Sequence, residues 1–262
     1  MSFETLNFSV ADNVATITLN RPDNANALNE KMARELFDVA VRCDTDASIR
    51  CAVLTATGKM FCAGGDLKDF NSQGANLPAY LTTTATALHN AIIRFQTMDA
   101  PLIVAVNGTA AGAGFSMALS GDYVIAADHA KFVSAYTASG LTPDGSSTYF
   151  IAKHVGLLRA KELALTNRVL NAEEARDWGL VTKVVPASAL AEETQTLAAQ
   201  FAAGPSRAFG ATKRLLLSGF SAGIEAQLEA ESRSIVAMAR TKDGLHGIDA
   251  FANKKKPVYK GE

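Results

Sequence analysis

Two short apolar runs, each followed by a loop rich in glycine and alanine, constrain this chain more than any other feature. Cys51–Ala56 precedes "GKMFCAGGDL", and Leu102–Gly108 leads into "NGTAAGAGFSMAL". A helical pattern around Leu81–Gln96 lies between the two runs, and the apolar run Tyr123–Ala127 predicts a further strand. Because strands and helices alternate, the sequence indicates an α/β fold.

Patterns on either side of this region extend the prediction. Alternating apolar and polar residues at Phe8–Val10 and Val14–Leu19 predict a hairpin, and a helix is expected at Glu30–Cys43. From Ala187 onward the chain reads as helical, with glycine breaks. The expected helices are Ala187–Ala203, Ser206–Ser218, Ile224–Arg240 and Asp243–Asn253, separated at Gly204-Pro205, Gly219 and Gly244. We therefore expect an α/β core over residues 1–200 and a helical region over 201–262.

Composition excludes several classes of function. The 262 residues are 48% hydrophobic and 19% charged, with a net charge of −1, so neither a disordered chain nor a nucleic-acid-binding protein is expected. No apolar window is long enough to span a membrane, and "MSFETLNFSVADNVATITLNRP" resembles no signal or transit peptide, so a cytoplasmic location is expected. Three cysteines without metal-ligand spacing predict buried free thiols, and four isolated histidines predict no metal site.

Two motifs resemble catalytic signatures but lack the structural context that those signatures need. "GFSAG" at Gly219–Gly223 matches a nucleophile elbow, but the residues before it have helical character, so a turn between helices is expected. "GAGFSM" at Gly112–Met117 begins like a dinucleotide fingerprint but lacks the third glycine. Neither motif supports serine hydrolase or nucleotide-cofactor chemistry.

The two glycine-rich loops are more informative as a pair. Small residues let a ligand approach the backbone, and N–H groups at a helix N-terminus point outward with the positive end of the helix dipole. "AGGDL" and "AAGAGF" could each present one such donor. Two converging donors form an oxyanion hole, whereas one loop alone would fit tight helix-on-strand packing equally well.

Five segments together resemble the crotonase (enoyl-CoA hydratase/isomerase) superfamily along essentially the whole chain. They are "NRPDNANALN", "FCAGGDLKDF", "APLIVAVNGTAAGAGFSMALSGDYVIAA", "LTNRVLNAEEARDWGLVTKVV" and "GIDAFANKKKPVYKG". The resemblance implies a spiral of ββα units with a C-terminal helical oligomerisation region, assembled as a trimer or a dimer of trimers. It also implies an acyl-CoA thioester as substrate, with coenzyme A as part of that substrate and no permanently bound cofactor.

The resemblance also implies roles for particular residues. The backbone N–H groups of Gly65 and Ala113 would hold the thioester oxygen as it becomes an enolate. Two segments and the last helix of a neighbouring subunit would contact coenzyme A. These candidate contacts are Ala25, Asn26, Ala27, Leu28, Ala63, Gly64, Asp66 and Leu67, with Phe251 and Lys254 from the neighbour.

The acid/base residues depart from the best-known members. Hydratases of the family carry two glutamates, whose places match Ser116 and Tyr136 here, and neither of these can act as a carboxylate base. The remaining candidate is Asp144 in "YTASGLTPDGSSTY", where Pro-Asp-Gly also suits a plain turn. An acid near this turn moves a proton in isomerases of the family, and an aspartate there is the nucleophile in its chlorobenzoyl-CoA dehalogenases. His89 matches a histidine of the dehalogenase site, but a tryptophan stands there in place of Tyr136.

These observations favour an enoyl-CoA isomerase with Asp144 as acid/base. His89, Tyr136 and Ser116 are secondary candidates to line the site. Three alternatives stay open: a hydratase, a hydrolase or dehalogenase of an aryl-CoA with Asp144 as base or nucleophile, and a CoA-binding scaffold without turnover. The sequence does not specify the acyl group.

Overall fold

The apolar runs pair into a main sheet in the computed structural model, which describes residues 3–262. This six-stranded sheet has the order β1(Leu6–Ala11), β2(Val14–Leu19), β3(Cys51–Ala56), β5(Leu102–Val106), β7(Tyr123–Ala127) and β10(Lys183–Val185). β1 and β2 form an antiparallel hairpin, and every other neighbouring pair is parallel. The expected hairpin and inner strands are confirmed.

A smaller sheet runs beside the main one and explains the spiral. It has the order β4(Met60–Cys62), β6(Thr109–Ala111), β8(Lys131–Val133) and β9(Leu170–Asn171). β3, β5 and β7 are each followed along the chain by a strand of this second sheet, β4, β6 and β8 respectively. Helices then return the chain to the main sheet, so each turn is a ββα unit, as the resemblance in sequence implies.

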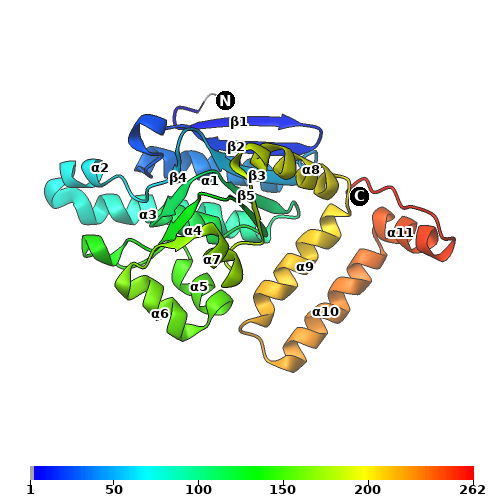
Figure 1. The fold of residues 1–262 in the computed structure, drawn as a ribbon. Helices are drawn as coiled ribbons and strands as arrows, with labels where there is room; N and C mark the ends of the chain where they lie inside the picture. The colour runs from blue at the N-terminus through cyan, green and yellow to red at the C-terminus, as the bar shows by residue number, and fades with distance from the viewer. Residues whose placement is uncertain (1–2) are drawn as a thin grey trace.

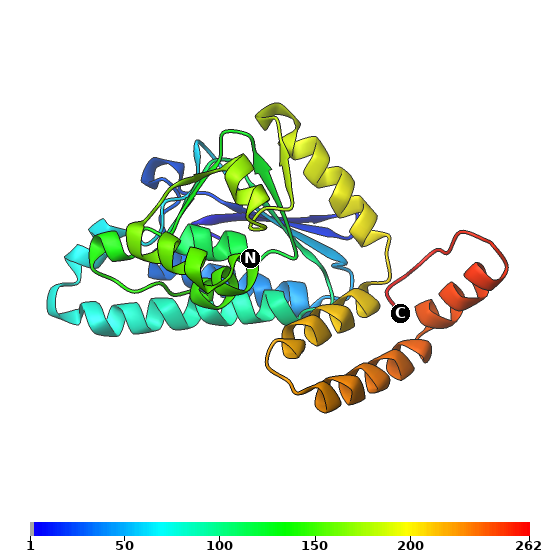
Figure 2. The same ribbon diagram turned by 60° about the horizontal axis from the view of Figure 1, so that its bottom comes forward.

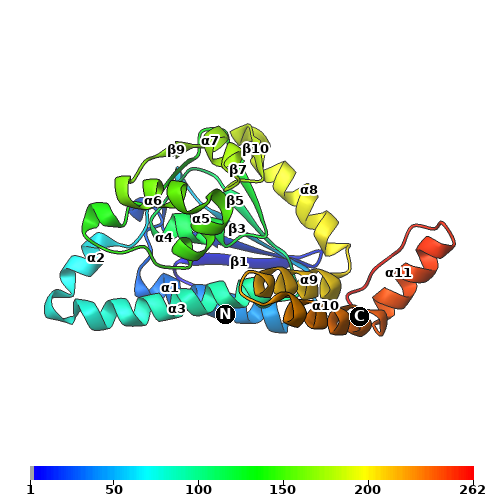
Figure 3. The ribbon, with the colours of Figure 1, turned by 90° about the horizontal axis from the view of Figure 1, so that it is seen from below.

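Helices cover both faces of the main sheet. α1(Glu30–Thr45) and α3(Leu77–Thr97) lie side by side on one face, and α8(Leu190–Ala202) packs across the other (Figure 3). The β5 run "LIVAV" serves both faces, since Val104 belongs to the α1/α3 cluster and Ile103 to the α8 cluster. A strand buried on both faces reads as a continuous apolar run, which is why no alternation marks it in the sequence.

The core also contains shorter helices. They are α2(Leu67–Ser72), α4(Ala113–Leu119), α5(Ser147–Val155), α6(Leu157–Thr166) and α7(Ala172–Asp177), with 3₁₀ turns at Pro22–Asn24, Gly74–Asn76, Thr137–Ser139 and Ala187–Ala189. Cys43, Cys51 and Cys62 are buried free thiols, as expected. Within residues 3–262, no helix is long and apolar enough to cross a membrane.

A helical arm follows the core, just after the boundary expected near residue 200 (Figures 1 and 2). α9(Ser206–Gly219) contacts α3, and then α10(Ile224–Ala239) and α11(Lys242–Ala252) extend away from the sheets (Figure 2). "GFSAG" forms the turn between α9 and α10, which confirms a turn between helices and places no strand before it.

The expected helix break at Gly244 is wrong. Gly244 lies in the first turn of α11, where its N–H donates to Oγ1 of the capping Thr241 at 2.9 Å. A Cβ on Gly244 would stand 2.1 Å from the Met238 carbonyl oxygen. This glycine therefore permits a close backbone contact at the corner between α10 and α11, and the break itself falls at Thr241.

A buried ion pair attaches the arm to the core. Lys213 Nζ of α9 lies 2.6 Å from Oδ2 of Asp122, just before β7, and also donates to the carbonyl oxygens of Phe95 (2.8 Å) and Ala100 (3.1 Å). Asp122 accepts the Leu102 N–H at 2.7 Å. Burial lowers the pKa of Lys213 and raises the pKa of Asp122, and the attraction between the two charges opposes both shifts. One ammonium group thus ties α9 to α3, β5 and β7.

Removing this ammonium group should destabilise the protein strongly. We expect Lys213→Met to cost about 3 to 5 kcal/mol at pH 7, because Asp122 keeps its buried charge without a partner. Burial holds the folded-state pKa of Asp122 above its unfolded value. The loss of stability should therefore shrink as the pH falls towards the pKa of a free carboxyl group, about 4, because Asp122 then becomes protonated. Urea denaturation at one fixed protein concentration measures both effects.

The double variant Lys213→Met/Asp122→Asn is the control. It removes the stranded charge and should recover much of the lost stability. If Lys213→Met unfolds at the wild-type urea concentration, the ion pair does not hold the arm.

Candidate active site

The two glycine-rich loops meet backbone to backbone. Gly64 follows β4 with a φ of +103°, and Gly112 follows β6 with a φ of +50°. A Cβ on Gly64 would lie 3.2 Å from the Ala111 carbonyl oxygen, and a Cβ on Gly112 would lie 3.3 Å from the Gly64 Cα atom. Only glycine suits both the conformation and the spacing at these two positions. Because β4 and β6 pair in parallel, both loops leave the same edge of the second sheet.

Each loop leaves one backbone donor free. Gly65 forms a bridge with Leu28 in which Leu28 N–H donates to Gly64 O (2.7 Å) and Asp66 N–H donates to Leu28 O (2.9 Å), so the Gly65 N–H takes no part. Ala113 is the first residue of α4, where an N–H group has no partner within its helix. Among residues 3–262, neither N–H group has a hydrogen-bond acceptor.

Both free donors border one cavity of about 420 Å³. Its walls come from the two loops, α2, the start of α3 and the segment 135–144, and they are mostly apolar. The lining residues are Leu28, Ala63, Gly64, Gly65, Leu67, Phe70, Leu81, Gly112, Ala113, Ala135, Tyr136, Ala138, Ser139, Leu141, Thr142 and Asp144. Asp144 is the single carboxylate in this lining.

Hydrogen bonds to the Asp144 carbonyl oxygen fix the turn at this residue. The Asp144 carbonyl oxygen accepts from Ser116 Oγ (2.9 Å), from Ser147 Oγ (3.0 Å) and from the Ser147 N–H (3.2 Å). Gly145 and Ser146 follow with φ values of +58° and +69°, a tight reversal that leads into α5. The backbone is thereby anchored while the side chain remains about one-third exposed at the cavity. The predicted turn is confirmed.

The Asp144 carboxylate has two side-chain neighbours. Tyr136 Oη donates to Oδ1 at 2.7 Å, and His89 Nε2 lies 3.3 Å from Oδ2. Tyr136 Oη also lies 2.8 Å from Ser116 Oγ. Burial, and after it the charge of Asp144, raises the pKa of Tyr136 above its ordinary value, so this phenol remains a protonated donor.

The structure thus gathers four residues that the sequence singled out separately. Tyr136 and Asp144 line the cavity, whereas His89 and the fully buried Ser116 contact these two residues from outside the lining. No member of the group would be paired with another by sequence spacing alone.

The candidate CoA residues divide into two groups in the core. Leu28, Ala63, Gly64 and Leu67 line the cavity. Asn26 is fully buried and donates to the carbonyl oxygens of Thr57 (2.8 Å) and Met60 (2.9 Å), so its side chain serves the fold.

Three more candidates lie beside these residues and also support the local structure. Asp66 pairs with Arg21 at 2.9 Å and caps α2. Ala25 has a φ of +52° in the turn before Asn26, and Ala27 is buried.

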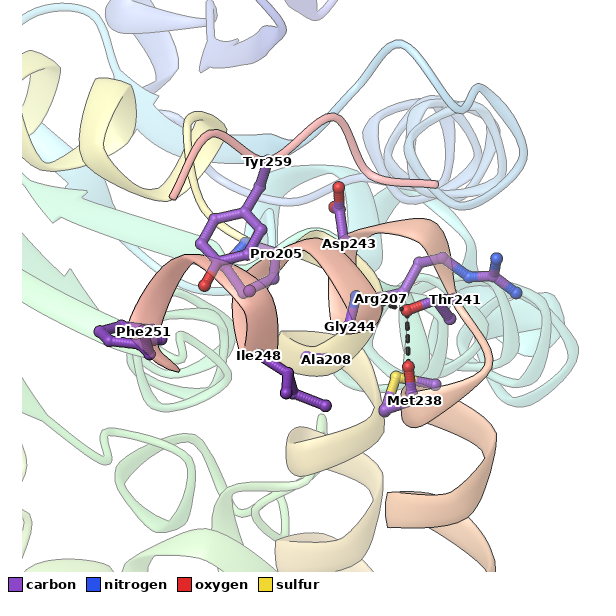
Figure 4. Close-up of a pocket in the computed structure, with 11 residues that line it drawn as sticks. Pro205, Arg207, Ala208, Met238, Thr241, Asp243, Gly244, Ile248, Phe251 and Tyr259 are labelled. Atoms are coloured by element: carbon purple, nitrogen blue, oxygen red, sulfur yellow. Dashed lines mark hydrogen bonds between the residues drawn. The ribbon is translucent and has the colours of Figure 1, made fainter. Parts of the chain in front are cut away.

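Phe251 and Lys254 lie in the arm, outside the lining of this cavity. Phe251 borders a second cavity of about 480 Å³ between α9, α11 and the C-terminal tail (Figure 4). Within one chain, these two residues therefore do not contribute to the site around Asp144.

Sequence reasoning missed much of the cavity wall. Phe70 and Leu81 line it from α2 and α3, and five residues between Ala135 and Thr142 line it from the loop before Asp144. A Cβ on Gly65 would stand 2.5 Å from the Phe70 ring, so Phe70 packs in the space that a side chain at position 65 would occupy. The residues between Tyr136 and Asp144 could have been predicted from their nearness to these two in the sequence. No sequence pattern indicated that Phe70 or Leu81 lines the cavity.

Comparison with known proteins gives the family. The model for enoyl-CoA hydratase/isomerase matches residues 9–262. A Rhodobacter capsulatus protein named "Probable enoyl-CoA hydratase" is 38% identical over 100% of both chains, and the 1,2-epoxyphenylacetyl-CoA isomerase of Escherichia coli is 37% identical over 97% of both. The crystal structure of an enoyl-CoA hydratase from Polaromonas sp. JS666 superposes with a TM-score of 0.92 at 32% identity, covering 97% of this chain and 99% of the other. The chain therefore belongs to the enoyl-CoA hydratase/isomerase family and has the crotonase fold.

Proposed function

We propose that the protein isomerises enoyl-CoA thioesters by moving a double bond through an enolate. The observation that carries the proposal is the single carboxylate, Asp144, in an apolar cavity that also contains two free backbone donors. Relatives named for hydratase and for isomerase activity are about equally similar, so the choice of reaction rests on the site.

The proposed reaction needs one acid/base group and one stabilised oxygen. The thioester oxygen accepts hydrogen bonds from Gly65 and Ala113, and Asp144 removes a proton from C2 of a 3-enoyl-CoA. The C2–H electrons form the C1=C2 bond of a dienolate as the carbonyl π electrons move onto the thioester oxygen, which carries the negative charge. Asp144 then returns the proton to C4: the C3=C4 electrons form the new C4–H bond, the C1=C2 electrons form C2=C3, and the carbonyl bond is restored. The product is a 2-enoyl-CoA. Each backbone donor of this kind is worth roughly 3 to 4 kcal/mol to the transition state.

Hydration is less well supported because it needs a further group to activate water. The positions of the two hydratase glutamates hold Ser116 and Tyr136. The hydroxyl of Ser116 is fully buried, and the raised pKa of Tyr136 keeps its phenol protonated. Among the cavity-lining residues of the described chain, no second carboxylate is present.

Coenzyme A binding is proposed along the rim formed by Ala25–Leu28 and Ala63–Leu67. The substrate brings this group, and no resident cofactor is proposed. Backbone atoms and the side chains of Leu28, Ala63 and Leu67 are available there, since those of Asn26 and Asp66 are engaged in the fold. Phe251 and Lys254 would complete the site from a neighbouring copy, where lysine suits a phosphate.

Assembly into a trimer or a dimer of trimers is proposed through the arm. α10 buries none of its residues within one chain, and Ile224, Leu228 and Ile235 on it are more than half exposed. Exposed apolar surface on this scale is typical of an interface between subunits.

Asp144→Asn tests the reaction. We expect loss of 3-hexenoyl-CoA isomerisation and of deuterium exchange at C2 and C4 in deuterated water, with little change in CoA affinity, because the amide keeps the shape but cannot take a proton. Mass spectrometry measures the exchange. A variant that isomerises at the wild-type rate would contradict the role of Asp144. A wild-type protein that binds CoA without exchange or turnover would redirect the search to aryl thioesters, and turnover of neither class would indicate a scaffold.

Gly112→Ala tests the oxyanion hole. The added Cβ would press on the Gly64 Cα atom and shift at least one donor, so we expect kcat to fall by about 10²- to 10³-fold. Gly156→Ala is the matched control, because Gly156 has a φ of +77° and no atom within 4 Å of its added Cβ. Equal activity in the two variants would show that the contact between the loops does not position the donors.

Ile235→Asp tests the assembly. A charge on this exposed position of α10 should convert the oligomer into a monomer in sedimentation velocity experiments. Arg233→Asp, on the same helix at a position that is already charged and exposed, is the control. A wild-type protein that sediments as a monomer would refute the proposed assembly.

A further inference from the structure

The two oxygens of the Asp144 carboxylate have neighbours of opposite character. Oδ1 receives the Tyr136 hydroxyl at 2.7 Å, and Oδ2 faces His89 Nε2 at 3.3 Å. A tyrosine hydroxyl that stays protonated can donate, and Ser116 Oγ lies 2.8 Å from it on its other side. The character of the His89 nitrogen depends on its tautomer.

The backbone settles that tautomer. The Gly145 N–H donates to His89 Nε2 at 3.1 Å, so Nε2 must present a lone pair and the ring proton must lie on Nδ1. With a hydrogen on Nε2, two N–H groups would point at each other. His89 therefore offers an acceptor to Asp144 Oδ2, although the same distance taken alone would suggest an ion pair.

An acceptor beside a carboxylate oxygen is useful only when that oxygen carries a proton. Nε2 has one lone pair, to which the Gly145 N–H already donates. Against the ionised Asp144, this lone pair gains no further hydrogen bond. Against the neutral acid, Oδ2–H can share it with the Gly145 N–H, over the 3.3 Å that separates Oδ2 from Nε2. Tyr136 on Oδ1 favours the ionised form by the same reasoning.

We infer that Tyr136 and His89 are positioning residues that hold Asp144 in its two protonation states, with Tyr136 serving the carboxylate and His89 serving the acid. The inference rests on the proposed function, because only a residue that takes and returns a proton must be held in both states. His89 is not part of the cavity lining and acts through Asp144.

The arrangement also assigns the proton to one oxygen. When the C2–H bond of the substrate breaks, its proton joins Oδ2, since Oδ1 is already engaged by Tyr136. The new Oδ2–H donates to Nε2 until the proton passes to C4 and the Oδ2–H bond breaks. Asp144 can thus retain one orientation through both transfers.

His89 of α3 and Tyr136 are the titratable side chains recorded within hydrogen-bond distance of Asp144 among residues 3–262. The other lining residues, from the two loops, α2, α3 and the segment 135–142, carry no charge. A shift in the titration of Asp144 in a variant of either neighbour can therefore be assigned to that neighbour.

The test is the titration of the Asp144 carboxyl carbon, followed by NMR in the full protein labelled with [4-¹³C]aspartate. Asp144→Asn identifies the resonance by its loss. Tyr136→Phe should move the titration midpoint up by about half a unit to one unit, because the carboxylate loses a donor. His89→Leu should move it down by a smaller amount, because the acid loses an acceptor that it shares with the Gly145 N–H.

Ser147→Ala is the matched control, since Ser147 Oγ donates to the Asp144 carbonyl oxygen and not to the carboxylate, so its loss should leave the midpoint in place. A midpoint that rises in His89→Leu would show that His89 acts as a cation or donor, and no change would show that it does not hold the acid form. Either result overturns the inference.

The readout does not depend on turnover. Opposite shifts in the two variants, together with an active Asp144→Asn, would refute the proposed function and leave the assignment of donor and acceptor standing.

Discussion

The contact between Gly64 and Gly112 is the constraint on which the site depends. Two loops that carry side chains at these positions could not approach as closely, since an added Cβ would meet backbone atoms at 3.2 to 3.3 Å. The parallel pairing of β4 with β6 brings the loops to one edge, and the missing side chains let them touch. The free N–H groups of Gly65 and Ala113 lie one residue beyond this contact. The pairing of the two strands therefore positions these N–H groups through the loops. A second sheet made of very short strands is enough for this purpose, because the main sheet and its helices supply the stability.

The turn at Asp144 is held by hydrogen bonds, whereas the Gly65 and Ala113 N–H groups that border the cavity are left unpaired. The Asp144 carbonyl oxygen accepts hydrogen bonds from Ser116 and Ser147, which fixes the turn without using the carboxylate. Unpaired donors inside a protein are costly, so two free N–H groups beside an apolar cavity indicate a ligand that accepts from both. Asn26 and Asp66 show the opposite case, since hydrogen bonds within the fold occupy their side chains.

Local patterns were sufficient to predict the main elements and the turn at Asp144. Apolar runs marked β3, β5 and β7, and 3.6-residue periodicity marked α1 and α3, because burial on a sheet or along a helix leaves a local record in the sequence. The partners of Asp144 leave no such record. His89 is 55 positions away from it, and Ser116 meets Tyr136 across 20 positions. Gly244 shows the remaining weakness, since a glycine that permits a close contact and a glycine that ends a helix look the same in a sequence.

The division between core and arm explains why the chain is longer than its chemistry requires. Every residue around Asp144 comes from the core, and the arm is attached to that core by Lys213 near the middle of α9, while α10 and α11 extend outward. A helix with no buried residue gains little stability from its own chain, because most helical stability in water comes from packing an apolar face. Helix α10 would therefore be stabilised in water if its exposed apolar side chains packed against another surface. A second copy offers one, and it would bring Phe251 and Lys254 to a site that their own core cannot reach. We therefore propose that the core supplies the acid, the oxyanion donors and the acyl cavity, and that CoA binding depends on assembly.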